Sequence, residues 1–454
     1  MQDARLRVAL YHRGHLLQSF LMTADVGIEG SAPTFVLEFS RSQRLTNLDD
    51  LGPRALSIAV NESPRAGHNL MIKTAGGALE VPFNANMVDK TVAATRTLLK
   101  DMKNVLPGPS KQTVPDPPRP TTDKALLDWW RKLAAHGQTA YRDLMAITGR
   151  SQEGLLDAIT RSDDQVVQIA RLDPGFVYPW PLLYDWVVPA RDVGQLPPDV
   201  CFGDPDADGR RRCTHGKGAD VICVYGFWAI RHQLDQVLTL GAARDPVRPV
   251  PQEPGAPQVR LAVGVSDKWT TELQTALAGV GNVGDLDVTD TATLIEALWR
   301  PEWRAPTIAV VAHHVDRDLA GEPPGSRLKL GNGSVFLSWE RIADALQLKL
   351  SWTAPNSVVL LMACESGQAT TARLDDFATL LTRAGAGAVV ATELDIGTDL
   401  AARCARDVTT DLLDGATFGA ALLRFHRRLA HVGNPFGFSF CWIGDAGLEV
   451  AHAG

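Results

Sequence analysis

The sequence has no apolar run long enough to cross a membrane and no excess of basic residues. Its apolar stretches fall well short of the roughly 18 residues that a spanning helix needs, and no charged segment followed by an apolar one opens the chain. The formal net charge is −7, and basic residues are not interleaved with aromatic ones. These absences argue against membrane insertion and against nucleic-acid binding, and they predict a cytoplasmic location.

Cysteine is also scarce. Six cysteines in 454 residues do not make the dense framework of a disulfide-stabilised secreted protein, so we expect reduced thiols, metal ligands or a catalytic group. The remaining composition, 45% hydrophobic and 21% charged, is ordinary for a globular protein of several domains.

An apolar strand that ends in a cysteine turn dominates the carboxyl-terminal half. Residues 358–362 are five consecutive apolar residues, typical of a strand buried on both faces, and residues 363–367 form the turn that follows. A second buried strand, 307–312, ends in His313 and His314, fifty residues before Cys364. Open α/β sheets place their chemistry at the carboxyl ends of strands. The two strand ends therefore predict a cysteine nucleophile with a histidine partner.

These segments resemble the CHAT family of caspase-like cysteine peptidases, which is related to separase and the caspases. The resemblance is carried by TIAVVAHHV, LKLGNGSVFLSWERI, SVVLLMACESG and GAGAVVATELDI, and it extends from about residue 122 to 450. It implies that His314 and Cys364 are the catalytic dyad and that the backbone N–H groups of Val315 and Cys364 hold the oxyanion. His313 and Val315 replace the glycines that flank the histidine in the family, and valine restricts the backbone more than glycine does.

The predicted function is that of an intracellular bacterial endopeptidase that cleaves a protein partner when activated, as CHAT proteins commonly do in defence or conflict systems. His313 is the rival base, but neighbouring residues of a strand point to opposite faces, so only one histidine can face Cys364. The family match favours His314. Because both flanking glycines are replaced, the alternative is a catalytically inactive CHAT scaffold that only binds partners.

Asp395 is a candidate substrate-binding residue. Leu394-Asp395-Ile396 follows the predicted strand 388–392 and resembles the Trp-Asp-Val of separase, whose aspartate lies in the pocket for a basic side chain. The resemblance implies a preference for arginine before the scissile bond. The other interpretation is an acidic residue that favours the positive end of a helix beginning near Thr398.

A second group of candidate ligands lies in the first half of the chain. Cys201, Cys213, His215 and Cys223 fall within 23 residues, and three thiolates with one imidazole would complete a tetrahedral structural zinc site. The alternative is that Cys223, which lies in an apolar run, is a core residue. The intervening aspartates resemble the start of a calcium loop, but its twelfth position is His215 rather than glutamate, which excludes an EF-hand.

Composition and periodicity divide the chain into five parts. Residues 1–105 are expected to form a small all-β domain that binds a regulatory protein partner, and prolines make 106–121 an extended linker. Residues 122–240 are expected to be the non-catalytic half of a CHAT domain, 241–258 a proline-rich connection, and 259–454 the catalytic half. Strands and helices alternate in the last part, which predicts a doubly wound α/β sheet with helices on both faces, and the resemblance implies that this sheet is caspase-like.

Overall fold

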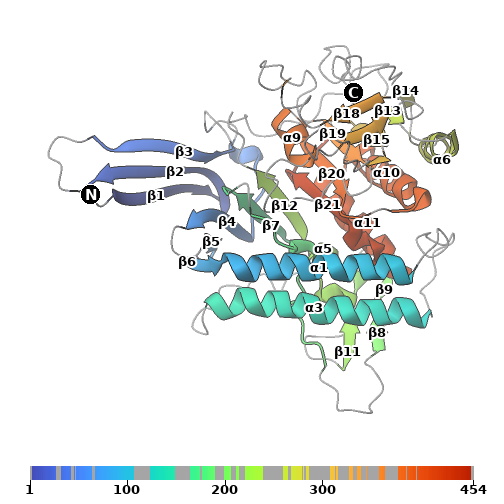
Figure 1. Ribbon diagram of the computed structural model, residues 1–454, viewed down its shortest axis with the longest axis horizontal. Helices are drawn as coiled ribbons and strands as arrows, with labels where there is room; N and C mark the ends of the chain where they lie inside the picture. The colour runs from blue at the N-terminus through green and yellow to red at the C-terminus, as the bar shows by residue number, and fades with distance from the viewer. Residues whose placement is uncertain are drawn as a thin grey trace, which may run out of the picture.

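The structure is a computed structural model that describes the chain in segments (Figure 1). The described segments are residues 3–26, 32–41, 45, 48–63, 67–106, 123–148, 164–173, 176–189, 199–205, 211–213, 220–238, 259–263, 267–278, 280, 283–285, 307–311, 313–314, 327–330, 335–338, 344, 357–362, 377–384, 386–394 and 396–450. The proline-rich stretches 107–122 and 239–258 lie outside them. Within these segments, every helix is too short or too polar to cross a bilayer.

A three-stranded antiparallel sheet projects from the body of the molecule (Figure 1). Its strands are β1 (Asp3–His12), β2 (His15–Asp25) and β3 (Thr34–Ser40). Arg13 and Gly14 connect β1 to β2 with φ angles of 49° and 77°, as a two-residue hairpin turn requires. At the base of this sheet, the N–H of Leu16 donates to the side chain of Gln168 at 2.7 Å, which attaches β2 to the next sheet.

The next sheet has five strands in the described part of the chain, in the order β12-β7-β4-β5-β6. The strands are β4 (Leu56–Ser63), β5 (Gly67–Thr74), β6 (Gly77–Asn84), β7 (Val166–Arg171) and β12 (Gln233–Leu238). β4 pairs antiparallel with β5 but parallel with β7, so the sheet joins residues on either side of the predicted linker at 106–121. Of the strands within residues 1–105, for which the sequence predicts a small all-β domain, β1 to β3 form a sheet of their own, and β4 to β6 belong to the five-stranded sheet.

Helix α1 (Ala85–Val105) occupies a stretch in which only strands had been expected. The side chain of Asn84 caps it by accepting a hydrogen bond from the N–H of Asn86 at 2.9 Å. Its buried residues recur at helical spacing and include Val88, Val92, Leu99 and Met102. A second long helix, α3 (Lys124–Thr148), lies beside it, and both pack against β6 (Figure 1).

Helix α3 continues through Gly137, although glycine is a poor helix former. A Cβ atom on Gly137 would lie 2.1 Å from the carbonyl oxygen of Leu182 and 3.0 Å from Cβ of Tyr184. The glycine is therefore explained by the close approach of the chain at the 3-10 helix η3 (Trp180–Leu182), not by a break in the helix.

A six-stranded sheet forms the carboxyl-terminal part, in the order β14-β13-β15-β19-β20-β21. All neighbouring pairs are parallel except β20 with β21. Its strands are β13 (Val259–Val263), β14 (Val283–Asp285), β15 (Thr307–Val311), β19 (Val358–Leu361), β20 (Ala388–Thr392) and β21 (Phe440–Gly444). This strand order is doubly wound, with its topological switch point between β13 and β15.

The helices around this sheet are α6 (Asp267–Leu277), α9 (Phe377–Ala384), α10 (Thr398–Leu413) and α11 (Phe418–His431). The connection from β13 through α6 to β14 crosses the sheet in one direction, and the connection from β19 through α9 to β20 crosses it in the other. Because parallel crossovers are right-handed, these two helices lie on opposite faces. α10 packs against α6, and α9 packs against β20 and β21 (Figure 1). The predicted α/β class with helices on both faces is therefore supported.

The five-stranded and six-stranded sheets meet where β12 lies against β21. The indole N–H of Trp442 donates to the carbonyl of Leu234 at 3.0 Å, and the N–H of Ala446 donates to the carboxylate of Asp235 at 3.1 Å. These bonds cross from β21 and its following turn to β12 without forming a β-ladder. The junction therefore depends on side chains.

A buried ion cluster lies at this junction and consists of Arg41, Arg54, Asp235 and Asp445. Arg54 donates to Asp235 at 2.9 Å and to Asp445 at 3.3 Å, and Arg41 forms an ion pair with Asp445. His15 is buried beside them, and desolvation together with Arg54 and Arg41 holds its pKa well below its usual value. The neutral form of His15 is therefore favoured, and the two arginines are balanced by the two aspartates.

We expect Asp235→Asn to lower the free energy of unfolding by about 3–5 kcal/mol, because it leaves a buried arginine without its counter-charge. The measurement is the midpoint and slope of denaturant unfolding. The control is Asp49→Asn, since Asp49 is exposed and lies 3.7 Å from the exposed Arg13. Equal effects of the two substitutions would contradict the buried cluster.

We expect Gly137→Ala to destabilise the protein by about 1–3 kcal/mol through overpacking against Leu182, although alanine is the better helix former. The control is Thr139→Ala at an exposed position of the same helix, which should be neutral or slightly stabilising. Thermal unfolding of both variants measures the difference. A stabilised Gly137→Ala variant would show that Leu182 does not approach the helix this closely.

Candidate active site and cysteine cluster

The two strands that lead to the predicted dyad are neighbours in the six-stranded sheet. β15 and β19 pair in parallel, with Val310 opposite Leu361. Their carboxyl ends therefore lie at the same edge, on one side of the switch point between β13 and β15. His313 and His314 form the short strand β16 directly after β15, and Cys364 follows the end of β19 by three residues.

β16 turns away from the main sheet into a hairpin. It pairs with β17 (Arg327–Leu330), which pairs with β18 (Val335–Ser338), and all these pairings are antiparallel. Gly-Asn-Gly at 331–333 is a sequence typical of a hairpin turn, and the antiparallel pairing of β17 with β18 agrees with it. His313 lies opposite Lys329, and His314 lies opposite Leu328. Cys364, Val315 and the side chains of both histidines are outside the described residues, so the dyad and the oxyanion site remain predictions.

The chain that leaves β20 reaches the same edge. Glu393 donates its N–H to the carbonyl of Ser439 at 2.7 Å, and Leu394 and Ile396 are buried in the core. Asp395, between these two residues, lies outside the described part. Helix α10 begins at Thr398 with Gly397 as its cap and already has Asp399 in its first turn. Asp395 therefore precedes the cap by two residues, which weakens its interpretation as a helix-dipole residue.

The amino-terminal half touches this edge through α1. Nε of Arg96 lies 3.9 Å from Oε2 of Glu393, and both side chains are partly buried. A cavity of about 100 Å³ lies beside the pair and is lined by Leu99, Tyr178 and Phe440, among others. No local pattern in the sequence indicates this contact, because Arg96 and Glu393 are almost three hundred residues apart.

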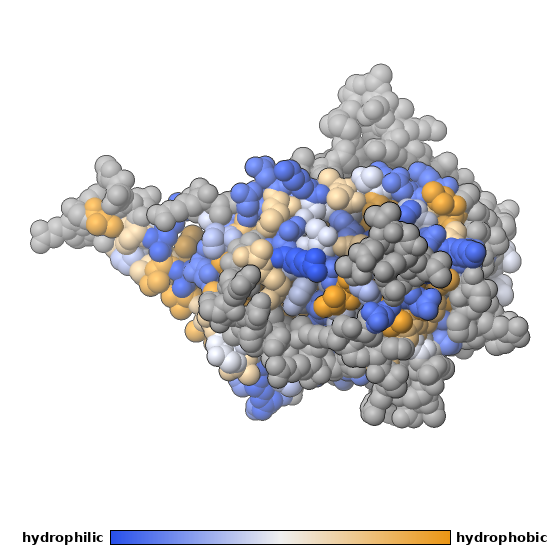
Figure 2. All heavy atoms as spheres, turned by 90° about the horizontal axis from the view of Figure 1, so that it is seen from below, coloured by the Kyte–Doolittle hydropathy of each residue, from blue (hydrophilic) through white to orange (hydrophobic). Residues whose placement is uncertain are grey.

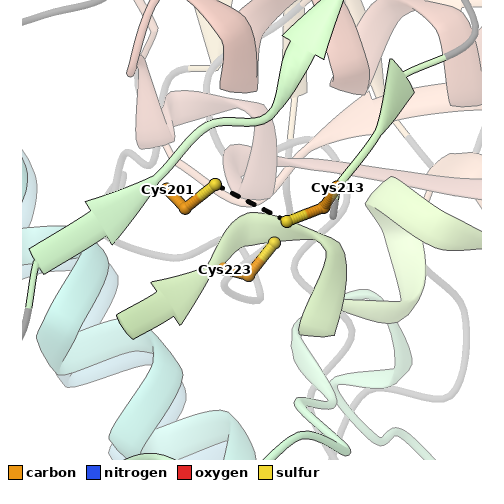
Figure 3. A group of neighbouring side chains, drawn as sticks. All are labelled: Cys201, Cys213 and Cys223. Carbon is orange, nitrogen blue, oxygen red and sulfur yellow. Dashed lines mark hydrogen bonds between the residues drawn. The ribbon is translucent and has the colours of Figure 1, made fainter. Parts of the chain in front are cut away.

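Three of the four predicted metal ligands come together (Figure 3). β8 (Asp199–Cys201) and β11 (Val221–Cys223) pair in parallel, with Cys201 opposite Cys223. β9 (Asp204–Pro205) and β10 (Arg211–Arg212) form an antiparallel pair that returns the chain to Cys201, and Cys213 follows β10 directly. The three Sγ atoms all lie within 4.8 Å of one another, so the cluster could hold a metal ion.

The cluster contains one fully buried thiol and two that are partly buried. Cys223 is fully buried, as its interpretation as a core residue requires, while Cys201 and Cys213 are partly exposed. Hydrogen bonds to Cys201 and Cys213, followed by burial, raise the pKa of the Cys223 thiol. His215, the fourth predicted ligand, lies outside the described residues.

A comparison with models of protein families finds a match to part of this chain. The model of the CHAT domain matches residues 231–447, a range that begins at the end of the short helix α5 (Trp228–Arg231) and ends beyond β21. It includes the six-stranded sheet, the β16 to β18 hairpin and β12, but not residues 122–230, to which the resemblance had been extended. No curated protein matched the chain. Residues 231–447 are therefore identified as a CHAT domain, the domain of a caspase-like family in the cysteine-peptidase clan.

Proposed function

We propose that this protein is a cysteine endopeptidase with Cys364 as nucleophile and His314 as its partner. The observation that supports it best is the pairing of β15 with β19 within the CHAT domain. This pairing brings the chain that carries His313 and His314 and the chain that continues to Cys364 to one edge of the sheet. Open α/β sheets bind their ligands at this edge.

In the proposed reaction, the thiolate of Cys364 attacks the peptide carbonyl carbon, and the carbonyl oxygen becomes an oxyanion. The backbone N–H groups of Val315 and Cys364 would stabilise that charge. His314 would protonate the leaving amine as the C–N bond breaks, and water would then hydrolyse the thioester to release the acid and the free thiol. Asp395 would bind the basic side chain before the scissile bond.

The alternative is a CHAT scaffold without activity. It is favoured by His313 and Val315, which replace the flexible residues that flank the family's histidine. Because a bulkier residue at 315 restricts φ and ψ, the N–H at this position could be turned away from the oxyanion. The two functions differ in one measurable property, the reactivity of Cys364.

The projecting sheet supports a regulatory role for a protein partner. Several exposed residues of β1 and β3 are apolar, among them Leu6, which is 54% exposed, and Phe35, which is 64% exposed. Figure 2 shows hydrophobic side chains gathered on this part of the surface. Exposed apolar patches of this kind mark contact surfaces. We propose that partner binding there switches on an intracellular bacterial peptidase of a defence or conflict system.

We expect a thiol-reactive peptide electrophile to label Cys364 faster than the other five cysteines. His314→Ala should slow labelling or peptide hydrolysis by about 10²–10⁴-fold, because it removes the acid-base group. His313→Ala is the matched control and should keep most of the rate. Intact-protein mass spectrometry measures the labelling, with and without candidate partners. Equal reactivity of all six cysteines under every condition would favour the scaffold.

We expect hydrolysis of fluorogenic peptides to require arginine before the cut, because a carboxylate pairs with guanidinium through two hydrogen bonds. Asp395→Ala should reduce the preference for arginine over leucine by about tenfold or more. Asp399→Ala, in the first turn of α10, is the control for a general charge effect. An unchanged preference in Asp395→Ala would exclude Asp395 from the substrate pocket.

A further inference from the structure

The spacing of three sulfur atoms is that of a metal-thiolate site. In a tetrahedral zinc site, Zn–S bonds of about 2.3 Å place two sulfur ligands about 3.8 Å apart. Sγ of Cys201 and Sγ of Cys213 are 3.6 Å apart, and Cys223 completes a group within 4.8 Å. A disulfide would require about 2.0 Å. The sulfurs are therefore too far apart to be bonded and close enough to share one ion.

The backbone around two of the cysteines supplies hydrogen bonds to sulfur. The N–H of Gly203, two residues after Cys201, donates to its Sγ at 3.3 Å. The backbone of Tyr225, two residues after Cys223, forms a hydrogen bond to the Cys223 thiol. Gly203 has a φ of 68°, a conformation that glycine adopts readily. Because N–H donors stabilise a thiolate, this repeated arrangement suits a charged sulfur ligand.

The register of β8 and β11 explains why both Cys201 and Cys223 accept a backbone hydrogen bond of this kind. Cys201 and Cys223 occupy opposite positions at the ends of the parallel strands β8 and β11. Each strand ends at its cysteine, so the following turn can fold its N–H back toward the sulfur. Cys213 approaches from the third side, at the end of the β9 and β10 pair (Figure 3). Three ligands thus come from three separate chain segments.

Aromatic contacts and a hydrogen bond connect the cysteine cluster to the CHAT domain. Phe202, next to Cys201, contacts Trp130 of α3 edge to face at 5.9 Å. Trp130 also contacts Phe438 at 5.7 Å, and its indole N–H donates to the carbonyl of Gly433 at 2.8 Å. An ion held by the cysteines would therefore fix a loop that supports the chain just before β21.

We propose that Cys201, Cys213 and Cys223 are thiolate ligands of one zinc ion, which is part of the folded state. Each thiol loses its proton on binding, and the divalent charge offsets most of the three negative sulfurs. This site is independent of the peptidase reaction proposed for Cys364, so either can fail without the other.

The test is metal analysis of the full chain purified without chelator. We expect about one zinc per chain in the wild type and less than about a tenth in Cys213→Ser and Cys223→Ser. Cys404→Ser is the matched control, because Cys404 is also fully buried but lies in α10, and it should retain its zinc. Less than about a tenth of an equivalent in the wild type after incubation with equimolar Zn²⁺ overturns the proposal.

Two further measurements use only the wild-type protein, so they test the proposal even if the serine variants fold poorly. Release of zinc from the wild type by a mercurial that titrates thiols should follow modification of three cysteines, and release before any thiol reacts contradicts the site. In the Co²⁺-loaded wild type, a near-ultraviolet thiolate charge-transfer band should have the intensity of three sulfur ligands. A missing band, or a Cys201–Cys213 disulfide in place of metal, also overturns the proposal.

Discussion

The arrangement of the three sheets depends on a group of buried charges with no net excess of either sign. Arg41 follows β3, Arg54 precedes β4, Asp235 lies in β12, and Asp445 follows β21. A buried charge is costly unless a partner is placed within hydrogen-bonding distance. The four chain segments can therefore pack together only in the arrangement that satisfies all four side chains. This condition specifies one orientation of the sheets relative to one another, whereas apolar contacts alone would tolerate several orientations.

The ion cluster also lies on a continuous path from the projecting sheet to the candidate active-site edge. Arg41 forms an ion pair with Asp445 one residue after β21, β21 pairs with β20 along its length, and β20 ends at Thr392, next to Glu393. On the other side, Arg96 of α1 reaches Glu393 directly. A displacement of the amino-terminal part would thus reach this edge by two physical routes. This offers a structural basis for the proposed regulation by a partner.

Local patterns in the sequence were sufficient to predict most strands of the six-stranded sheet in the CHAT domain. The strand 388–392 and the hairpin of β17 and β18 carry their signals within a few residues, and the structure contains both. The pairing of β4 with β7 could not be predicted, because the two segments are over a hundred residues apart and strand pairing leaves no local pattern. Helix α1 was missed although Val88, Val92 and Leu99 are spaced for it. The three-residue strands that align Cys201 with Cys223 are too short to show periodicity.

At β12, the boundary of the family match differs from the boundary of the folded unit. The family match begins just before β12, yet this strand takes its backbone partners from β7, outside the matched range. Excised at the boundaries of the match, residues 231–447 would carry a bare edge strand and lose the arginine that neutralises Asp235. Exposed edges of this kind promote aggregation. The CHAT domain of this protein therefore depends on its neighbour for the partner strand of β12 and for the counter-charge of Asp235, so we expect it to fold only together with the five-stranded sheet.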